Sequence, residues 1–235
     1  MKKLISILLT SSLVFAADNE IYVDQSGATA NIDLEQLGSG NIIGGLNSVA
    51  GTLTALDLDG ISLTLDINQL GDTNKFLGDI LGDNITGFFE FDGDTNIFDI
   101  KVDETNTYGA DSSNLQVNVT GNQNDMSLDQ ALSAMASSLD LDWTIQGDQN
   151  TIDADIDIDS ATNYMNVDGD ENSVNYNGDG FAGGYFHLTH DGNNRAFNIT
   201  QASTQDNDWL KITSDGNSGS FCIIQNDQGL STSCP

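Results

Sequence analysis

One spacing recurs along most of this chain: a glycine is followed, three places later, by an asparagine. In six copies an apolar residue also stands two places after the asparagine. Glycine and asparagine tolerate the positive φ of a tight corner, and asparagine can hold such a corner with its own side-chain amide. Each copy therefore predicts a strand, a corner and a second strand. The six asparagines are Asn41, Asn74, Asn96, Asn124, Asn150 and Asn172.

The stretch from 145 to 174 holds two of these copies, with Gly147 and Gly169 at their corners. Between the two corners, isoleucine and alanine alternate with aspartate from Ile152 to Asp159. A period of two places apolar side chains on one face of a strand and carboxylates on the other. This stretch is therefore expected to be half buried, with an acidic outer face.

Glycines near the start of the chain lie on a grid of 11 residues, at Gly27, Gly38, Gly60, Gly71, Gly82 and Gly93. Two grid units make a period of about 22 residues, which is in the range of stacked repeat proteins. We therefore predict an all-β fold, a β-solenoid or β-helix whose coils of about 22 residues each contain two strand–turn units. Stacking of the coils would align the six asparagines in a hydrogen-bonded structural ladder.

Two segments depart from this pattern. Residues 127–139 carry apolar side chains at helical spacing, and Ser127 and Gln130 are placed as a capping box, so we predict a short inserted helix there. Gly44 to Leu56 is irregular and reads as a loop or a short helix. The remainder, residues 18–235, is expected to form a single solenoid domain that ends in a C-terminal cap at about 205–235.

Residues 1–17 have the features of a cleaved secretory signal peptide, with Lys2 and Lys3 before an apolar core. That core is shorter than the roughly 20 residues of a membrane span, and no later segment is apolar enough to be one. We therefore expect an extracellular or cell-surface protein without a transmembrane span. In an oxidising compartment Cys222 and Cys234, the two cysteines of the chain, are expected to form a disulfide, with two free thiols as the less favoured alternative.

The chain is strongly acidic, with a formal net charge of −30. Removal of Lys2 and Lys3 would leave four basic residues against 36 acids, or −32. Such a surface argues against nucleic acid as a partner, because nucleic-acid sites are basic. The regular apolar alternation favours a folded chain over an acidic disordered one.

Three half-repeats near the start of the chain run from Gln25 through Gly27 to Asn31, from Gln36 through Gly38 to Asn41, and from Gln69 to Asn74. They resemble the repeat of curlin, the subunit of bacterial curli fibres, in which Gln, Gly and Asn recur in this order in units of about 22 residues. The resemblance implies a secreted β-solenoid subunit that polymerises by stacking its terminal strands and contributes to biofilm matrix and adhesion. Later units carry Phe, Val or Ile in place of the glutamine.

Oxygen ligands at alternate positions around two of the glycines suggest calcium, the one candidate cofactor ion for this chain. The alternative is a solvated acidic face, which screens its charge with loosely held cations, and we favour it because neither set continues into a known calcium loop. The candidate metal ligands are Asp92, Asp94 and Asn96, and Asp168, Asp170 and Asn172.

Nothing in the sequence indicates a catalytic site. His187 and His190, the two histidines, are three residues apart in an expected strand, so their side chains would face opposite sides. No nucleophile motif lies between a strand and a helix, and with 36 acids a catalytic carboxylate pair has no specific signature. Aromatic residues that could stack on sugar rings, or pack in the core, are Tyr176, Phe181, Tyr185 and Trp209.

We therefore expect a non-catalytic, curlin-like structural protein of an extracellular fibre, biofilm matrix or surface adhesin. Its expected partners are other copies, other fibre subunits, or surface glycans. A polysaccharide-binding or polysaccharide-cleaving β-helix protein that uses acids and calcium is one alternative, and a virus-encoded surface or fibre protein is another.

Overall fold

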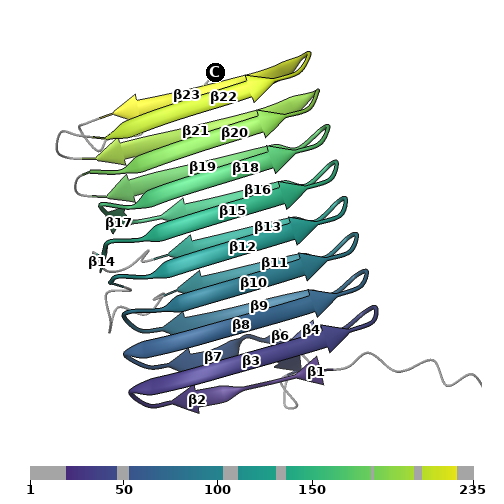
Figure 1. Ribbon diagram of the computed structural model, residues 1–235, viewed down its shortest axis with the longest axis vertical. Coiled ribbons are helices and arrows are strands. Elements are labelled where there is room, and N and C mark those ends of the chain that lie inside the picture. The colour runs from purple at the N-terminus through teal and green to yellow at the C-terminus, as the bar shows by residue number, and fades with distance from the viewer. Residues whose placement is uncertain are drawn as a thin grey trace, which may run out of the picture.

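The computed structural model describes residues 20–46, 53–102, 111–130, 136–180, 183–203 and 208–226. Every regular element in these ranges is a β-strand. The strands stack in two facing parallel sheets, and the chain crosses from one sheet to the other at each corner (Figure 1). The predicted all-β solenoid is confirmed. The signal peptide predicted for residues 1–17 lies outside the described residues.

The eight-stranded sheet contains one strand from each successive coil, and all of its pairs are parallel. In spatial order its strands are β3 (Thr29–Leu37), β8 (Ser62–Leu70), β10 (Thr86–Asp92), β12 (Asn114–Thr120), β15 (Asp140–Gln146), β18 (Thr162–Asp168), β20 (Tyr185–Asp191) and β22 (Trp209–Asp215).

The eleven-stranded sheet forms the opposite layer and is also parallel. Its main path is β1 (Glu20–Ile21), β4 (Ile42–Ile43), β9 (Lys75–Leu81), β11 (Ile97–Val102), β13 (Asp125–Gln130), β16 (Thr151–Ile156), β19 (Ser173–Gly180), β21 (Arg195–Ser203) and β23 (Gly219–Asn226), and β2 (Asp24–Ser26) and β7 (Leu56–Asp59) join it at the N-terminal end.

Two small sheets lie beside these layers. The segment from 44 to 56, expected to be a loop or short helix, contains the antiparallel pair β5 (Gly45–Leu46) and β6 (Leu53–Thr54), while residues 47–52 lie outside the described residues. The parallel pair β14 (Ala136–Ser137) and β17 (Ile158–Asp159) extends the stacking between neighbouring coils.

The core lies between the two sheets and consists of columns of side chains that stack from coil to coil. Alternate residues of each strand point inward, as in β15, where Leu141, Trp143 and Ile145 are at most 2% exposed. The residues at the glutamine position of the curlin-like units stack from coil to coil and form one such column. It holds Gln36 and Gln69 in the first coils and Phe91 in the next, in direct register.

The two edges of the solenoid differ. At one edge the corner has the same four-residue length in coil after coil, for example residues 93–96 between β10 and β11. At the other edge the length varies, because the paired residues are 22 apart between β8 and β10 but 28 apart between β10 and β12. We call the first the corner edge and the second the variable edge; they are the right and left sides of Figure 1.

The glycines of the 11-residue grid are divided between the two edges of the solenoid. Gly38, Gly71 and Gly93 lie at the corner edge, whereas Gly27, Gly60 and Gly82 lie at the variable edge. The half-repeat that begins at Gln25 therefore belongs to the edge opposite to those that begin at Gln36 and Gln69.

The predicted helix at 127–139 is wrong wherever this segment is described. Ser127 and Gln130 of the expected capping box lie in β13, Ala136 and Ser137 form β14, and residues 131–135 lie outside the described residues. Parallel pairing overrides the local helical pattern, because Leu128 stacks in register between Ile100 and Ala154 and is fully buried.

The C-terminal region 205–235, expected to be a cap, continues the two sheets over its described residues 208–226 as β22 and β23. Cys222 lies in β23 and is disulfide-bonded, while Cys234 lies outside the described residues. In the ranges described, there is no helix of the length and apolarity that a membrane crossing requires.

Candidate functional site

The corner edge is the most regular surface of the protein. Each corner consists of a glycine, an Asp or Asn in most coils, a third residue, and the buried asparagine of the repeat. The third residue adopts a left-handed conformation in every described corner from Thr73 to Ser218, with φ between 55° and 61°. This conformation ends one strand and reverses the chain into the other sheet within four residues.

The corner glycines stack so closely that no side chain fits between them. A Cβ on Gly147 would lie 2.1 Å from the carbonyl oxygen of Gly121 in the neighbouring coil, and a Cβ on Gly169 would lie equally close to that of Gly147. Their φ values of 131° and 135° are also in the region that favours glycine. Glycine at this corner is thus required by both the backbone conformation and the stacking distance.

The buried asparagines form a continuous inner ladder. The backbone N–H of each asparagine donates to the side-chain Oδ1 of the equivalent residue in the next coil, as from Asn124 to Asn150 at 2.9 Å and from Asn150 to Asn172 at 2.8 Å. The same bond joins Asn41 to Asn74, Asn74 to Asn96 and Asn96 to Asn124. All six residues are at most 2% exposed, so the ladder satisfies backbone groups that water does not reach.

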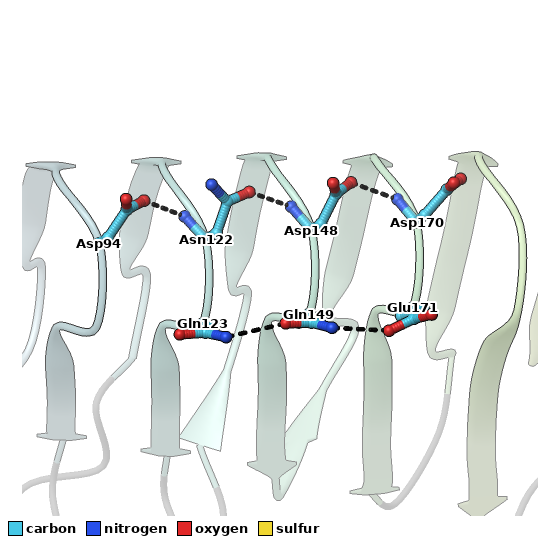
Figure 2. Close-up of a pocket in the computed structure, with 7 residues that line it drawn as sticks. All are labelled: Asp94, Asn122, Gln123, Asp148, Gln149, Asp170 and Glu171. Atoms are coloured by element: carbon cyan, nitrogen blue, oxygen red, sulfur yellow. Dashed lines mark hydrogen bonds between the residues drawn. The ribbon is translucent and has the colours of Figure 1, made fainter.

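A second, outer ladder runs along the solvent side of the same corners (Figure 2). Here the Oδ1 of one residue accepts from the backbone N–H of the next: Asp94 from Asn122, Asn122 from Asp148, and Asp148 from Asp170. It continues from Asp72 at one end to Asn193 and Asn217 at the other. Beside it Gln123, Gln149 and Glu171 join side chain to side chain, at 2.9 and 2.7 Å. These two columns line a pocket along the edge.

The structure separates the predicted calcium ligands instead of gathering them. Asn96 and Asn172 turn into the core and belong to the inner ladder, whereas Asp94 and Asp170 point to the solvent side and accept backbone hydrogen bonds. Asp92 and Asp168 occupy the exposed ends of β10 and β18. Among the described residues, no group of three or more acids, histidines or cysteines is placed to hold a metal ion. The carboxylates along the corner edge therefore lie apart from one another, one in each coil that carries an aspartate there.

A second acidic cluster lies at the variable edge, around Asp157. Burial, reinforced by the neighbouring carboxylates of Asp155 and Asp179, raises the pKa of Asp157 to about 7. Burial and Asp155 also raise the pKa of Asp179. The folded protein therefore holds a proton on Asp157 more tightly than the unfolded chain does.

This proton makes stability depend on pH. The pKa of Asp157 is higher in the folded protein than in the unfolded chain, so protonated Asp157 favours folding. This contribution to the free energy of unfolding is fully present below about pH 4 and is lost as the pH rises through about 7. With discounting for half exposure, we expect the free energy of unfolding to fall by about 1–2 kcal/mol over this range. Urea titrations at several pH values should show a smaller fall for Asp157→Asn, while the exposed-site control Asp142→Asn keeps the wild-type fall. Equal pH profiles for wild type and Asp157→Asn would refute the assignment.

The two histidines face opposite sides of β20, as the sequence predicted. His190 is 1% exposed, and burial followed by the nearby Arg195 lowers its pKa. His187 lies on the outer face, and its pKa is lowered first by partial desolvation and then by Lys211. Of the four aromatic residues singled out as sugar-stacking candidates, Tyr176 is buried, Tyr185 and Trp209 lie on the outer face, and Phe181 lies outside the described residues.

Arg195 ends the inner ladder, and sequence reasoning missed this role. It occupies the asparagine position of its corner, and its guanidinium donates to the carbonyls of Gly192 and Ser218 at 3.1 and 3.0 Å. It also lies over the ring of Phe221 at 5.1 Å. The sequence does contain a signal for this role, because Arg195 stands three places after Gly192, the position that asparagine occupies in the other repeats. The outer ladder was likewise readable from the Asp or Asn that directly follows so many corner glycines.

Among the described residues, the corner edge and the outer face of the eight-stranded sheet carry ordered arrays of polar and aromatic side chains. The chain matches no family model, no curated protein and no solved structure.

Proposed function

We propose that this chain is a secreted, non-catalytic structural subunit, curlin-like, that associates end to end in an extracellular fibre, biofilm matrix or surface adhesin. Support comes from the strands at the two ends of the solenoid. Among the described residues, β22 and β23 at one end, and β1, β2 and β3 at the other, have no strand paired to their outer edges. Unpaired backbone groups at such an edge can accept a further parallel strand.

The observation that carries the proposal is the exposure of core columns at these ends. Phe221 and Ile223 continue the inward-facing columns of the eleven-stranded sheet, yet they are 42% and 46% exposed. At the other end Ile32 and Leu34 of β3 are only partly buried. Covering both surfaces with another coil would remove this apolar area from water, at about 25 cal/mol per Å².

The two ends also match in chemistry if the parallel register continues from one copy to the next. The column of β22 that contains Leu210 begins at Ile32 of β3, and the column of Ile212 begins at Leu34. A second copy stacked in register would thus place Ile32 on Leu210 and Leu34 on Ile212. On the outer face the same stacking sets Asp33 beside Lys211, one of the few cations in the chain.

Charge reversal at this contact tests the proposal. Lys211→Glu would place two carboxylates side by side, so the concentration at which the protein associates is expected to rise about tenfold or more in sedimentation velocity experiments. Adding Asp33→Lys to the same chain restores an opposite-charge pair and should restore association. The proposal fails if the double variant associates no better than Lys211→Glu while both keep the wild-type circular dichroism spectrum.

A further inference from the structure

The last coils of the eight-stranded sheet carry a group of exposed rings on their outer face, at the green to yellow end of Figure 1. This aromatic patch consists of Tyr164 on β18, Tyr185 and His187 on β20, and Trp209 on β22. Tyr164 and Trp209 are each 43% exposed. The four rings form one connected set, because Tyr164 contacts both Tyr185 and His187, and Trp209 contacts the same two residues.

The rings are held in a fixed arrangement by parallel pairing. Tyr185 and Trp209 are directly in register, and their rings stack at 4.3 Å with an interplanar angle of 4°. The far face of Trp209 contacts no other ring among the described residues. Rigid rings lose little conformational entropy on binding, so they are effective contact surfaces.

On the three strands of the patch, the outer face carries carboxylates only at the strand ends. The column that contains Tyr164 has its three acids before the patch and none within it, and it runs Asp33, Asp66, Phe88, Gln116, Asp142, Tyr164, His187 and Lys211. The neighbouring column has one acid, Asp140, and changes from polar to aromatic side chains: Asn31, Thr64, Thr86, Asn114, Asp140, Thr162, Tyr185 and Trp209. His187 stays mostly neutral at pH 7, because desolvation and Lys211 lower its pKa.

Hydrogen-bonding groups without charge border the rings. The next outward column of the same three strands consists of Asn166, Thr189 and Thr213. The Thr189 hydroxyl lies 3.5 Å from Nε2 of His187. The surface therefore combines flat apolar rings with hydroxyl and amide groups, and carboxylates stand only around it, at Asp140, Asp142, Asp168, Asp191 and Asp215.

We propose that the aromatic patch is a binding site for a neutral polysaccharide chain. The C–H face of a sugar ring packs on exposed aromatic rings, while its hydroxyls exchange hydrogen bonds with Thr, Asn and His side chains. Polyanions are poor occupants, because the surrounding protein carries a net charge of −30. Tyr164, Tyr185 and His187 lie on the outer face away from the end of the solenoid, whereas Trp209 lies on the terminal strand, where in-register stacking would set Asn31 of the next copy beside it. The four rings are complete on a single subunit, so the inference does not rest on the assembly.

Affinity electrophoresis and tryptophan fluorescence test this site. The mature protein is run through native gels that contain hydroxyethyl cellulose, a soluble β-1,3-glucan, galactomannan, alginate or no polymer. We expect at least one neutral glycan to retard the wild type, and Tyr164→Ala and Trp209→Ala each to weaken that retardation about tenfold or more. Phe88→Ala is the matched control, because Phe88 occupies the column of Tyr164 three strands away and should leave retardation unchanged.

Acrylamide quenching localises the contact. The chain has two tryptophans, and Trp143 is 2% exposed, so quenching reports mainly on Trp209. The glycan that retards the protein should protect the wild type from quenching and should protect Tyr164→Ala less. Retardation by alginate alone, by no glycan, or equally in all variants would overturn the proposal. Tyr164→Ala separates the two proposals, because Tyr164 lies on β18, two strands away from the terminal strand β22. A loss of glycan binding by this variant with normal sedimentation would leave the assembly proposal intact.

Discussion

Gly147→Ala is expected to prevent the middle coils from stacking and to cost more than about 4 kcal/mol of folding free energy. The new Cβ would lie 2.1 Å from a backbone carbonyl oxygen, which no side-chain rotation can relieve. The backbone would also have to hold alanine at a φ of 131°. Urea-induced unfolding followed by circular dichroism would show a large fall in the midpoint, or no cooperative transition.

Gly38→Ala is the matched control for this substitution. Gly38 has a similar φ of 119°, but the atom nearest to a Cβ there is the amide nitrogen of Asn41, at 3.5 Å. Alanine at 38 therefore imposes backbone strain without the clash, and we expect about 1–2 kcal/mol of destabilisation. Equal effects at the two positions would mean that conformation alone, and not the close stacking of coils, requires glycine.

Asn150→Ala is expected to destabilise the protein by about 2–3 kcal/mol, because it removes the acceptor of the Asn124 backbone N–H in a place that water does not reach. Asn122→Ala is the comparison: it removes the same kind of bond, to the N–H of Asp148, from the exposed outer ladder. There water can replace the lost acceptor, and we expect less than about 1 kcal/mol.

Thermal or urea unfolding of the two variants measures this difference directly. A cost at position 122 equal to that at 150 would contradict the division into a buried, stabilising ladder and a solvated one.

The spacing of glycine and asparagine was sufficient to predict the solenoid and the shared column of Asn41 to Asn172, because stacked coils must bring equal positions together. The sequence pattern could not show which glycines share an edge. Gly60 and Gly71 look alike on the 11-residue grid, and only the alternation of strands between two sheets sends them to opposite edges.

Other features depended on tertiary pairing that local sequence does not contain. Ser127 and Gln130 are placed as a helical capping box, but in-register pairing of β13 with β11 and β16 decides their conformation. Asp94 and Asn96 are two residues apart, as calcium ligands would be, yet the corner sends one side chain to solvent and the other into the core. The sequence singled out Tyr185 and Trp209 but not Tyr164, because only the parallel pairing of β18, β20 and β22 brings their rings together.

The proposed stacking of one solenoid on the next through their exposed end coils is tested most directly by electron microscopy and X-ray diffraction of the purified protein. We expect unbranched filaments one solenoid wide, with a reflection at about 4.8 Å along the filament axis, which shows that the stacking direction of the strands follows the filament. Discrete particles of single-subunit size at every concentration and ionic strength would contradict the claim.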